Sequence, residues 1–431
     1  MPGTHPAASY LVCPPARLID ATIRPPGSKS YTNRALLLAG LAGGTSTLRG
    51  ALFSDDTMHM ARGLEALGFG VHADEAARTF TVTGGGGQIP TSRASIFVGN
   101  SGTTARFLAP MTALGRGSYE LDGDEAMRVR PIQPLLDAMN ALGARASSVR
   151  GNGCLPLRID GGGFEGGTAR MPGSISSQFF SALLMVGPAL RRGIVLEVVG
   201  ELVSKPYLEI TAQAMTAFGA TMTHDAYRRF EVAPGAYTAT RYDVEPDASA
   251  ASYFFAAAAV TGGRVIVSGL GSRSLQGDLG FVRLLERMGC RVHQTETETE
   301  VVGPAKLAGI EADMASLSDT AQTLAAIAPF ASSPTRITKI GFIRKKETNR
   351  IAAVVTELHK LGIRAEEESD GLVVHPGTPR AGRVETYDDH RMAMSFSVLG
   401  LAAHGIDILN PACVSKTFPE YFRELEKLTG R

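Results

Sequence analysis

The sequence predicts an α/β fold of two similar domains, each with three βαβαββ-like units around buried parallel helices, six units in all. Two recurring patterns predict this fold. In the first, a helix ends in glycine before an alternating strand, at Gly68, Gly143, Gly219, Gly289 and Gly362. These glycines lie 70 to 76 residues apart, so the 431 residues hold about six units. Each glycine suits the left-handed position that follows a helix.

The second pattern is in phase with the first and consists of six segments rich in alanine and leucine that open with small polar or charged residues. They cover residues 28–44, 101–117, 174–193, 247–263, 318–333 and 388–405. Each is predicted to be a helix with an N-capping serine or aspartate, Ser28 being the first such cap. A helix that is apolar on nearly every side belongs inside a domain. We therefore expect six buried helices, wrapped by strands and by surface helices.

The remaining elements of each unit follow its buried helix. A strand comes first, as in STLRG, YELDG, IVLEVVG and RVIVSG, and an amphipathic helix with one or two further strands comes next. The last unit, which starts near Asp388, has no closing strand, whereas residues 9–19 form a strand without a unit. We expect this N-terminal strand to complete the sixth unit. One domain is then 23–243 and the other is discontinuous, 1–22 plus 246–431, with hinges near 20–26 and 241–247.

Composition argues against several classes of function. With 43 Lys and Arg against 42 Asp and Glu the net charge is +1, so no bulk field indicates nucleic acid or an anionic membrane as a partner. The cysteines Cys13, Cys154, Cys290 and Cys413 lack the spacing of a zinc site or a disulfide framework. No apolar run reaches the length of a membrane span, and the N-terminus lacks the order of a signal peptide. We expect a soluble, cytoplasmic protein.

Basic residues gather at the predicted starts of the buried helices and in nearby loops. They are Lys29, Arg34, Arg106, Arg130, Arg344, Lys345, Lys346, Arg350, Arg391 and Lys416. A helix N-terminus itself favours anions, because its N–H groups are unpaired and its dipole is positive. Two such domains facing each other would enclose an anion-attracting cleft. Since both domains carry these groups, a ligand with two separate anionic ends fits better than one with a single phosphate.

Candidates for acid–base chemistry are few. Asp319 is either a plain N-cap or a proton carrier, and Glu347 is either an i,i+3 ion-pair partner of Arg350 or an acid. Asp389 and His390 are either a cap and a satisfied histidine or functional groups. The chain has no GxSxG, HExxH or metal-type DxD motif. The predicted chemistry is therefore proton transfer with electrostatic stabilisation of an anionic substrate, without metal or organic cofactor.

Nine segments between about residue 20 and the C-terminus carry a closer resemblance. They are PPGSKSYTNRALLLAGLAGGT, GNSGTTARF, RVRPIQPLLDAMNALGA, SISSQFFSALLM, ELVSKPYLEIT, DASAASYFFAAAAV, RKKETNRI, YDDHRMAMSFS and SKTFPEYF. Together they resemble the 5-enolpyruvylshikimate-3-phosphate synthases of the enolpyruvyltransferase family. The resemblance implies an inside-out α/β barrel of six units, in agreement with the repeat. It also implies transfer of the enolpyruvyl group of phosphoenolpyruvate to the 5-hydroxyl of shikimate 3-phosphate, with release of phosphate, in the shikimate pathway to chorismate and aromatic amino acids.

The resemblance also implies roles for individual residues. Those expected to bind shikimate 3-phosphate are Lys29, Ser30, Arg34, Ser176, Ser177, Gln178, Ser204, Tyr207, Asp319 and Lys346. Those expected to bind phosphoenolpyruvate are Lys29, Gly102, Arg130, Gln178, Arg350, Arg391 and Lys416. Asp319 would take the proton of the 5-hydroxyl, Glu347 would protonate the methylene carbon, and Lys346 would stabilise charge beside it. Lys29 and His390 complete the expected catalytic set, with His390 either transferring a proton or orienting Asp389.

Two alternatives remain at this point. A sister enolpyruvyltransferase acts on UDP-N-acetylglucosamine, but its motif has Lys-Asn where this chain has Lys29-Ser30, and it uses a mobile-loop cysteine that is missing here near Arg130. A non-catalytic phosphoanion-binding protein on the same scaffold is the other, against which the joint presence of Lys29, Asp319 and Glu347 argues. The self-contained two-domain plan favours a monomer.

Overall fold

The computed structural model describes residues 9–430 and divides into two compact units. The continuous unit is Gly27–Glu245, and the discontinuous unit combines the described residues up to Pro26 with those from Pro246 onward. Residues 1–8 and 431 of the predicted second domain lie outside the described residues. Within residues 9–430, no helix is both long enough and apolar enough to cross a membrane.

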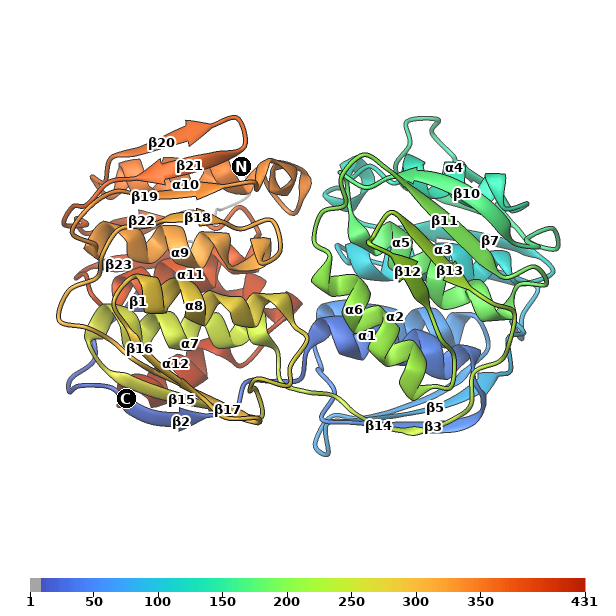
Figure 1. The fold of residues 1–431 in the computed structure, drawn as a ribbon, viewed down its shortest axis with the longest axis horizontal. Coiled ribbons are helices and arrows are strands. Elements are labelled where there is room, and N and C mark those ends of the chain that lie inside the picture. The colour runs from blue at the N-terminus through green and yellow to red at the C-terminus, as the bar shows by residue number, and fades with distance from the viewer. Residues whose placement is uncertain (1–8, 431) are drawn as a thin grey trace, which may run out of the picture. The chain divides into compact units, whose positions relative to one another are not determined.

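Three buried helices form the centre of each unit, as predicted (Figure 1). In the continuous unit these are α1 (Lys29–Leu41), α3 (Gly102–Ala113) and α5 (Ser177–Val186). In the discontinuous unit they are α7 (Ala248–Thr261), α9 (Ala321–Ile327) and α11 (His390–Gly400), which contact one another pairwise. Glycine allows close approach of two of these helices, because a Cβ added at Gly40 of α1 would lie 3.1 Å from the methyl group of Met111 in α3.

Six further α-helices of residues 9–430 lie outside the buried ones. They are α2 (Asp55–Ala66), α4 (Gln133–Ala141), α6 (Pro206–Ala217), α8 (Phe281–Arg287), α10 (Arg350–Lys360) and α12 (Tyr421–Thr429). The glycines at 68, 143, 219, 289 and 362, which follow α2, α4, α6, α8 and α10, all have positive φ, between 77° and 102°. The predicted helix ends are therefore confirmed at all five positions.

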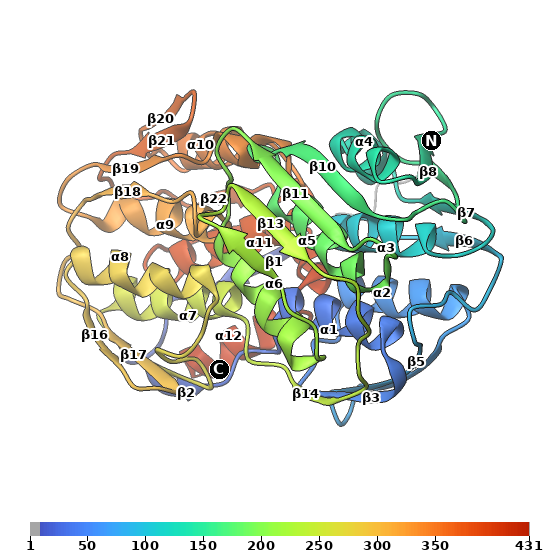
Figure 2. The same ribbon diagram turned by 45° about the vertical axis from the view of Figure 1, so that its right-hand side comes forward.

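The described strands form six sheets on the outside of the helices (Figure 2). In the continuous unit they have the orders β14(Arg241–Asp243)-β3(Gly43–Arg49)-β5(Thr79–Gly85)-β4(Gly70–Asp74), β6(Arg93–Phe97)-β7(Ser118–Asp122)-β9(Leu157–Asp160)-β8(Arg145–Ser148) and β10(Gly167–Pro172)-β11(Ile194–Val199)-β13(Arg229–Val232)-β12(Thr223–Asp225). In the discontinuous unit they are β16(Arg291–Gln294)-β17(Glu298–Val302)-β15(Arg264–Ser268)-β2(Asp20–Ile23), β18(Glu311–Asp313)-β19(Thr335–Thr338)-β21(Gly371–Val374)-β20(Ala365–Glu368) and β1(Ser9–Val12)-β23(Ile406–Leu409)-β22(Gly382–Val384). Each of the six has a linear strand order, so the described strands form open sheets and no closed barrel.

Two repeats exchange their leading strands. β2 precedes α1 in the chain but pairs in parallel with β15 of the discontinuous unit, while β14 precedes α7 but pairs in parallel with β3 of the continuous unit. The continuous unit therefore begins at Gly27 rather than at residue 23, because Ile23 lies opposite Val267 in β2–β15. The N-terminal strand β1 pairs with β23, which places it in the sixth repeat.

The helix caps agree only in part with the prediction. Ser101, Ser176, Asp247 and Asp389 accept a hydrogen bond from the first turn of their helices. Ser28 is in the N-cap position of α1, but its side chain makes no capping hydrogen bond, so that prediction is wrong in its chemistry. Asp319 is no N-cap either, because the short 3₁₀ helix η4 (Ser318–Thr320) precedes α9 and places Thr320 at the cap.

Candidate active site

Lys29 of the continuous unit lies at the start of α1 beside a buried carboxylate. Its Nζ is 3.2 Å from Oδ2 of Asp56, which is 3% exposed and belongs to the first turn of α2. The backbone carbonyl of Asp56 in turn accepts a hydrogen bond from the Thr104 hydroxyl of α3. This ion pair holds the ammonium of Lys29 at the helix start, next to Ser30, while keeping the local net charge low.

Arg34, one turn further along α1, is enclosed by the continuous unit and is only 1% exposed. Its guanidinium donates to the carbonyls of Ser30 and Tyr207 and to the hydroxyls of Thr211 and Ser181. Burial lowers the pKa of Arg34 to about 10, against the favourable influence of nearby tyrosines. The side chain therefore braces α1 against α5 and α6, and its role as a substrate ligand stays a prediction.

Replacement of Arg34 by lysine is expected to destabilise the continuous unit, because an ammonium cannot make the same fork of hydrogen bonds. We expect the free energy of unfolding to fall by roughly 2 kcal/mol, as read from urea denaturation. Arg49→Lys is the matched control, since Arg49 forms an exposed ion pair with Asp243 and should matter little. Equal losses in the two variants would contradict the bracing role of Arg34.

Gly102 and Arg130 lie against each other at the start of α3. A Cβ added at Gly102 would come within 2.9 Å of Nη2 of Arg130. Nη1 of the same guanidinium donates to Oδ1 of Asn100 at 3.3 Å. The guanidinium thus covers the backbone at the helix start, where only glycine leaves room for it. This is a basic group held at the N-terminus of a helix, an arrangement suited to a carboxylate or phosphate.

The start of α5 presents Gln178 between two partners on α3. Its side-chain amide accepts a hydrogen bond from Arg106 and donates one to the hydroxyl of Thr103 at 3.2 Å. Ser176 caps the helix through the Gln178 N–H, and Ser177 is buried beside it. The amide of Gln178 is thereby oriented from both sides.

The start of α6 supplies the other two residues expected in the continuous unit, Ser204 just before the helix and Tyr207 in its first turn. Ser204 has a left-handed backbone (φ 55°), which is uncommon for a residue with a side chain. The ring of Tyr207 lies 6.0 Å from the guanidinium carbon of Arg34. The carbonyl of Tyr207 also accepts a hydrogen bond from Arg34, which fastens the start of α6 to α1.

Asp319 is the centre of a charged cluster in the discontinuous unit. Its Oδ1 lies 2.5 Å from Nζ of Lys346 and 3.2 Å from Nη1 of Arg350, and its Oδ2 lies 2.7 Å from Nη2 of Arg391. Burial raises the pKa of Asp319, but Arg391, Lys346 and Arg350 together hold it well below its usual range. The carboxylate is therefore ionised and aimed, with basic groups on both oxygens.

Glu347 shares Arg350 with Asp319. Its Oε2 lies 2.7 Å from Nη2 of Arg350, and its Oε1 lies 4.0 Å from Nζ of Lys416 in the 3₁₀ helix η7 (Pro411–Lys416). The i,i+3 ion pair considered from sequence is therefore present. The two acid–base candidates, Asp319 and Glu347, therefore both contact the guanidinium of Arg350.

Asp389 and His390 lie behind this cluster at the start of α11. Asp389 accepts from Nε of Arg350 at 2.8 Å and from the backbone N–H of Arg391, so it is the predicted cap as well as an ion-pair partner. His390 is buried, with its Nδ1 3.6 Å from Oδ1 of Asp389. Among the described residues the cluster sets Lys346, Arg350, Arg391 and Lys416 against Asp319, Glu347 and Asp389.

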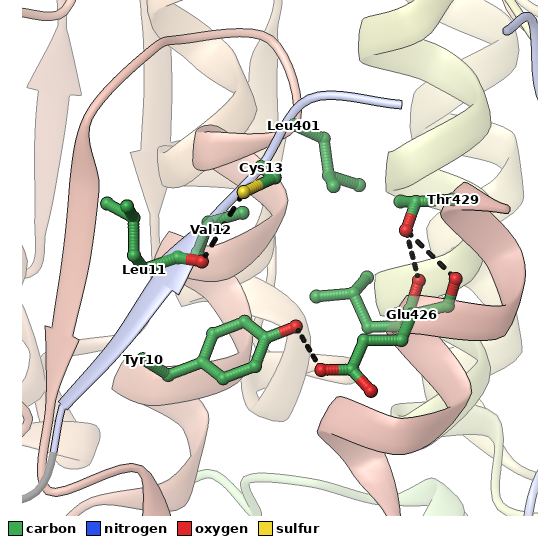
Figure 3. Close-up of a pocket in the computed structure, with 8 residues that line it drawn as sticks. Tyr10, Leu11, Val12, Cys13, Leu401, Glu426 and Thr429 are labelled. Carbon is green, nitrogen blue, oxygen red and sulfur yellow. Dashed lines mark hydrogen bonds between the residues drawn. The ribbon is translucent and has the colours of Figure 1, made fainter. Parts of the chain in front are cut away.

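Other sequence candidates lie apart from both clusters. Arg344 pairs with Glu367 at 2.7 Å and with the backbone of Glu368, and Lys345 is exposed. A pocket of about 180 Å³ between β1 and α12, lined among others by Tyr10, Cys13 and Glu426, contains none of the predicted site residues (Figure 3). Within residues 9–430 no group of three or more His, Cys, Asp or Glu side chains is arranged to hold a metal ion.

Several residues of the clusters were missed from sequence. Asp56 is the second acid of a Ser-Asp-Asp helix start, a pattern that reads as ordinary charge–dipole stabilisation. Asn100 and Tyr253 are neutral partners of the basic groups Arg130 and Arg391, and Thr103 is the partner of Gln178. Neutral partners of this kind have no sequence signal of their own.

Comparison with known proteins identifies the family. The EPSP synthase (3-phosphoshikimate 1-carboxyvinyltransferase) family matches residues 14–425. The chain belongs to the EPSP synthase family. It is 47% identical over 416 residues to the 3-phosphoshikimate 1-carboxyvinyltransferase of Trichormus variabilis, covering 96% of this chain and 98% of the relative.

Relatives in plants and solved structures extend the comparison. The chloroplastic 3-phosphoshikimate 1-carboxyvinyltransferase of Brassica napus is 42% identical, covering 99% of this chain and 86% of the relative. The EPSP synthase structure from Acinetobacter baumannii aligns with a TM-score of 0.80 over 97% of both chains at 24% identity, which supports the fold. The family predicted from the sequence is thus confirmed, and so is the predicted fold class.

Proposed function

We propose that the protein transfers the enolpyruvyl group of phosphoenolpyruvate to the 5-hydroxyl of shikimate 3-phosphate and releases phosphate. Family membership supports this reaction, a step of the shikimate pathway to aromatic amino acids. The observation that carries it is the pairing of two carboxylates, Asp319 and Glu347, on the guanidinium of Arg350. An addition–elimination needs a base for the hydroxyl and an acid for the methylene carbon at neighbouring points, among fixed cations.

In the addition, the O–H bond of the 5-hydroxyl breaks and its proton goes to Asp319. The oxygen electron pair forms the bond to C2 of phosphoenolpyruvate, while Glu347 gives a proton to C3. In the elimination, the ionised Glu347 takes a proton back from the new methyl group, and the electron pair of that C–H bond re-forms the double bond between C2 and C3. The bond from C2 to the phosphate oxygen breaks with its electron pair on the departing phosphate, which leaves with the proton of the former hydroxyl group. Lys346 stabilises charge beside Glu347 during these steps.

Binding of phosphoenolpyruvate prepares Glu347 as an acid. We assign Arg350, Arg391 and Lys416 of the discontinuous unit to the anionic groups of phosphoenolpyruvate. Arg350 and Lys416 are ion-pair partners of Glu347 in the structure. An anion that draws these cations away leaves Glu347 beside negative charge, which favours its protonated form. The acid is thus ready when its substrate is bound.

The continuous unit supplies the remaining ligands in this proposal. We assign Lys29, Gly102, Arg130 and Gln178 to phosphoenolpyruvate. Shikimate 3-phosphate is assigned to Lys29, Ser30, Arg34, Ser176, Ser177, Gln178, Ser204 and Tyr207, together with Asp319 and Lys346. Hydroxyl groups and helix N-termini suit a phosphate monoester, and cations suit the carboxylates.

The substitution Gly102→Ala is expected to weaken the binding of phosphoenolpyruvate and to leave the binding of shikimate 3-phosphate unchanged. The added methyl group must displace the guanidinium of Arg130, which is the far end of a flexible side chain, so the fold should survive. We expect the KM for phosphoenolpyruvate to rise about tenfold, with that for shikimate 3-phosphate unchanged within about twofold, in steady-state kinetics. Gly235→Ala, where nothing lies within 4 Å of the new Cβ, is the control. A rise in both KM values would argue against the assignment of Arg130.

Two other functions are weaker. The sister reaction on UDP-N-acetylglucosamine would need a cysteine nucleophile, but burial raises the pKa of the Cys154 thiol, the one cysteine of the described continuous unit. A non-catalytic anion-binding protein would not need Asp319 aimed by three cations. Phosphate release in a buffer with EDTA, with each acceptor in turn, decides between them. We expect release with shikimate 3-phosphate and none with UDP-N-acetylglucosamine, and binding without release would indicate the non-catalytic function.

The cytoplasmic location, the monomeric state and the independence from metal and cofactor stay predictions. Gel filtration with light scattering tests the monomer, for which one 45.4 kDa species is expected.

A further inference from the structure

Asp278 is a buried carboxylate of the discontinuous unit that the reaction as described leaves unused. It lies in the 3₁₀ helix η3 (Gly277–Gly280), is 4% exposed, and accepts a hydrogen bond from the hydroxyl of Ser249 in the first turn of α7. Its neighbour Gln276 accepts from the Ala248 N–H and donates to the Pro246 carbonyl, which fixes η3 to the start of α7. A buried acid held so firmly needs an explanation, because burying a charge is costly.

η3 also contacts η4, the 3₁₀ helix that carries Asp319. The two carboxylates are close enough to interact electrostatically, and a positive group, Arg391, lies within reach of both. Burial, followed by the negative charge of Asp319, raises the pKa of Asp278 to about 6, while Arg391 and the Ser249 hydroxyl oppose the rise. Asp278 is therefore mostly ionised at pH 8 and mostly protonated at pH 5.

We propose that Asp278 is a positioning residue that acts through Asp319, as a fixed buried anion that makes Asp319 a stronger base during the transfer. This inference rests on the proposed function. The interaction between two charges is mutual. Because the charge of Asp319 favours protonation of Asp278, the charge of Asp278 favours protonation of Asp319 to the same extent. Asp319 is otherwise surrounded by three cations, which stabilise its ionised form and weaken it as a base.

The benefit of Asp278 arises at the reacting stage. Before reaction, the repulsion between Asp278 and Asp319 destabilises the ionised pair, and transfer of the hydroxyl proton to Asp319 removes that repulsion. An interaction that is unfavourable in the ground state and relieved as the proton moves lowers the barrier. Ser249 then has a separate role, which is to stabilise the ionised form of Asp278.

The charged groups that act on Asp278 include Asp247 at the N-cap of α7, Asp319 on η4 and Arg391 on α11. The charged residues of α8, which follows η3 directly, are exposed: Arg283, Glu286 and Arg287. The titration of Asp278 is therefore set mainly by burial and by the Asp319 site.

The test uses single-turnover rates with both substrates saturating, from pH 5 to pH 9, for the whole protein and for Asp278→Asn. Asparagine keeps the shape and an acceptor for Ser249 but removes the charge. At pH 8 we expect the variant to be about tenfold slower with unchanged KM values, a smaller loss than for the base itself. The ratio of wild-type to variant rate should fall towards one as the pH decreases through about 6, because Asp278 then loses its charge in the wild type. Titration of the substrate phosphates is common to both proteins and cancels in this ratio.

Ser249→Ala provides a second test that leaves Asp278 in place. Without the hydrogen bond from Ser249 the ionised form of Asp278 is less stable, so the rate of the variant should begin to fall at a higher pH than the wild-type rate does. At pH 9 the rate of the variant should be within about twofold of the wild-type rate. A purely structural role predicts instead that both variants are slower at every pH, and a constant ratio would overturn the proposal. An inactive wild type would contradict the proposed function, whereas an active wild type with an equally active Asp278→Asn would contradict this inference alone.

Discussion

Glu347→Gln is expected to bind both substrates and to lose turnover by at least about 10³-fold. Glutamine retains the size and an acceptor for Arg350, which contacts Oε2 of Glu347 at 2.7 Å, but it has no proton to give to C3. The loss should appear in kcat and in the rate of a single turnover, with KM values within a few-fold of wild type. Rapid-quench measurement of phosphate release after mixing checks it.

A second readout separates the acid from a mere ion-pair partner. In deuterated water, Glu347 should deliver deuterium to C3, so unreacted phosphoenolpyruvate and product should gain deuterium in the methylene group. The label should be lost along with turnover in Glu347→Gln and be kept in Glu296→Gln, an exposed control that pairs with Arg273. Near-normal turnover of Glu347→Gln would remove Glu347 from the role of acid.

Asp319→Asn should have an effect of similar size for a different reason. The substitution removes the base for the 5-hydroxyl, and we expect kcat to fall about 10³-fold. It also leaves Lys346, Arg350 and Arg391 without the carboxylate that they share. Anionic substrates should therefore bind at least as tightly as to the wild type, as measured by calorimetry.

The pH dependence of this loss follows from the charge state of Asp319. Because the surrounding cations hold its pKa well below the usual range, Asp319 is ionised throughout the neutral range and loses its charge only in strong acid. The ratio of wild-type to Asp319→Asn rates should then be flat between pH 7 and pH 9. Asp225→Asn, an exposed partner of Arg228, is the matched control and should behave as wild type. Weaker substrate binding with normal kcat would indicate that Asp319 orients ligands and takes no proton.

Much of the fold follows from the sequence because each repeat carries its own local signals. The glycine after α2, α4, α6, α8 and α10 must adopt positive φ, and helices without a polar face must be interior, so both patterns identify elements directly. The exchange of β2 and β14 between repeats has no such signal. Both are short strands in front of a helix, and only tertiary pairing with β15 or β3 decides to which sheet each belongs.

The candidate site divides in the same way. Basic residues at apolar helix starts stand out in the sequence, since a lone charge beside a buried segment needs a reason. Their partners do not stand out: Asp56 reads as an ordinary first-turn acid, and Asp278 as a polar turn residue in Gln-Gly-Asp. The hydrogen bonds of Arg34 to Thr211 and Ser181 could not be predicted from the sequence either, because these two residues lie far from Arg34 in the chain.

The most direct test of the central claim is the fate of the bridging oxygen of phosphoenolpyruvate. Carboxyvinyl transfer breaks the bond between C2 and this oxygen, whereas phosphoryl transfer or simple hydrolysis at phosphorus leaves the oxygen on carbon. With ¹⁸O in the bridging position and shikimate 3-phosphate present, we predict released phosphate that retains the label, in equal amount to an enolpyruvyl product. Unlabelled phosphate, or phosphate formed without shikimate 3-phosphate, would contradict the account.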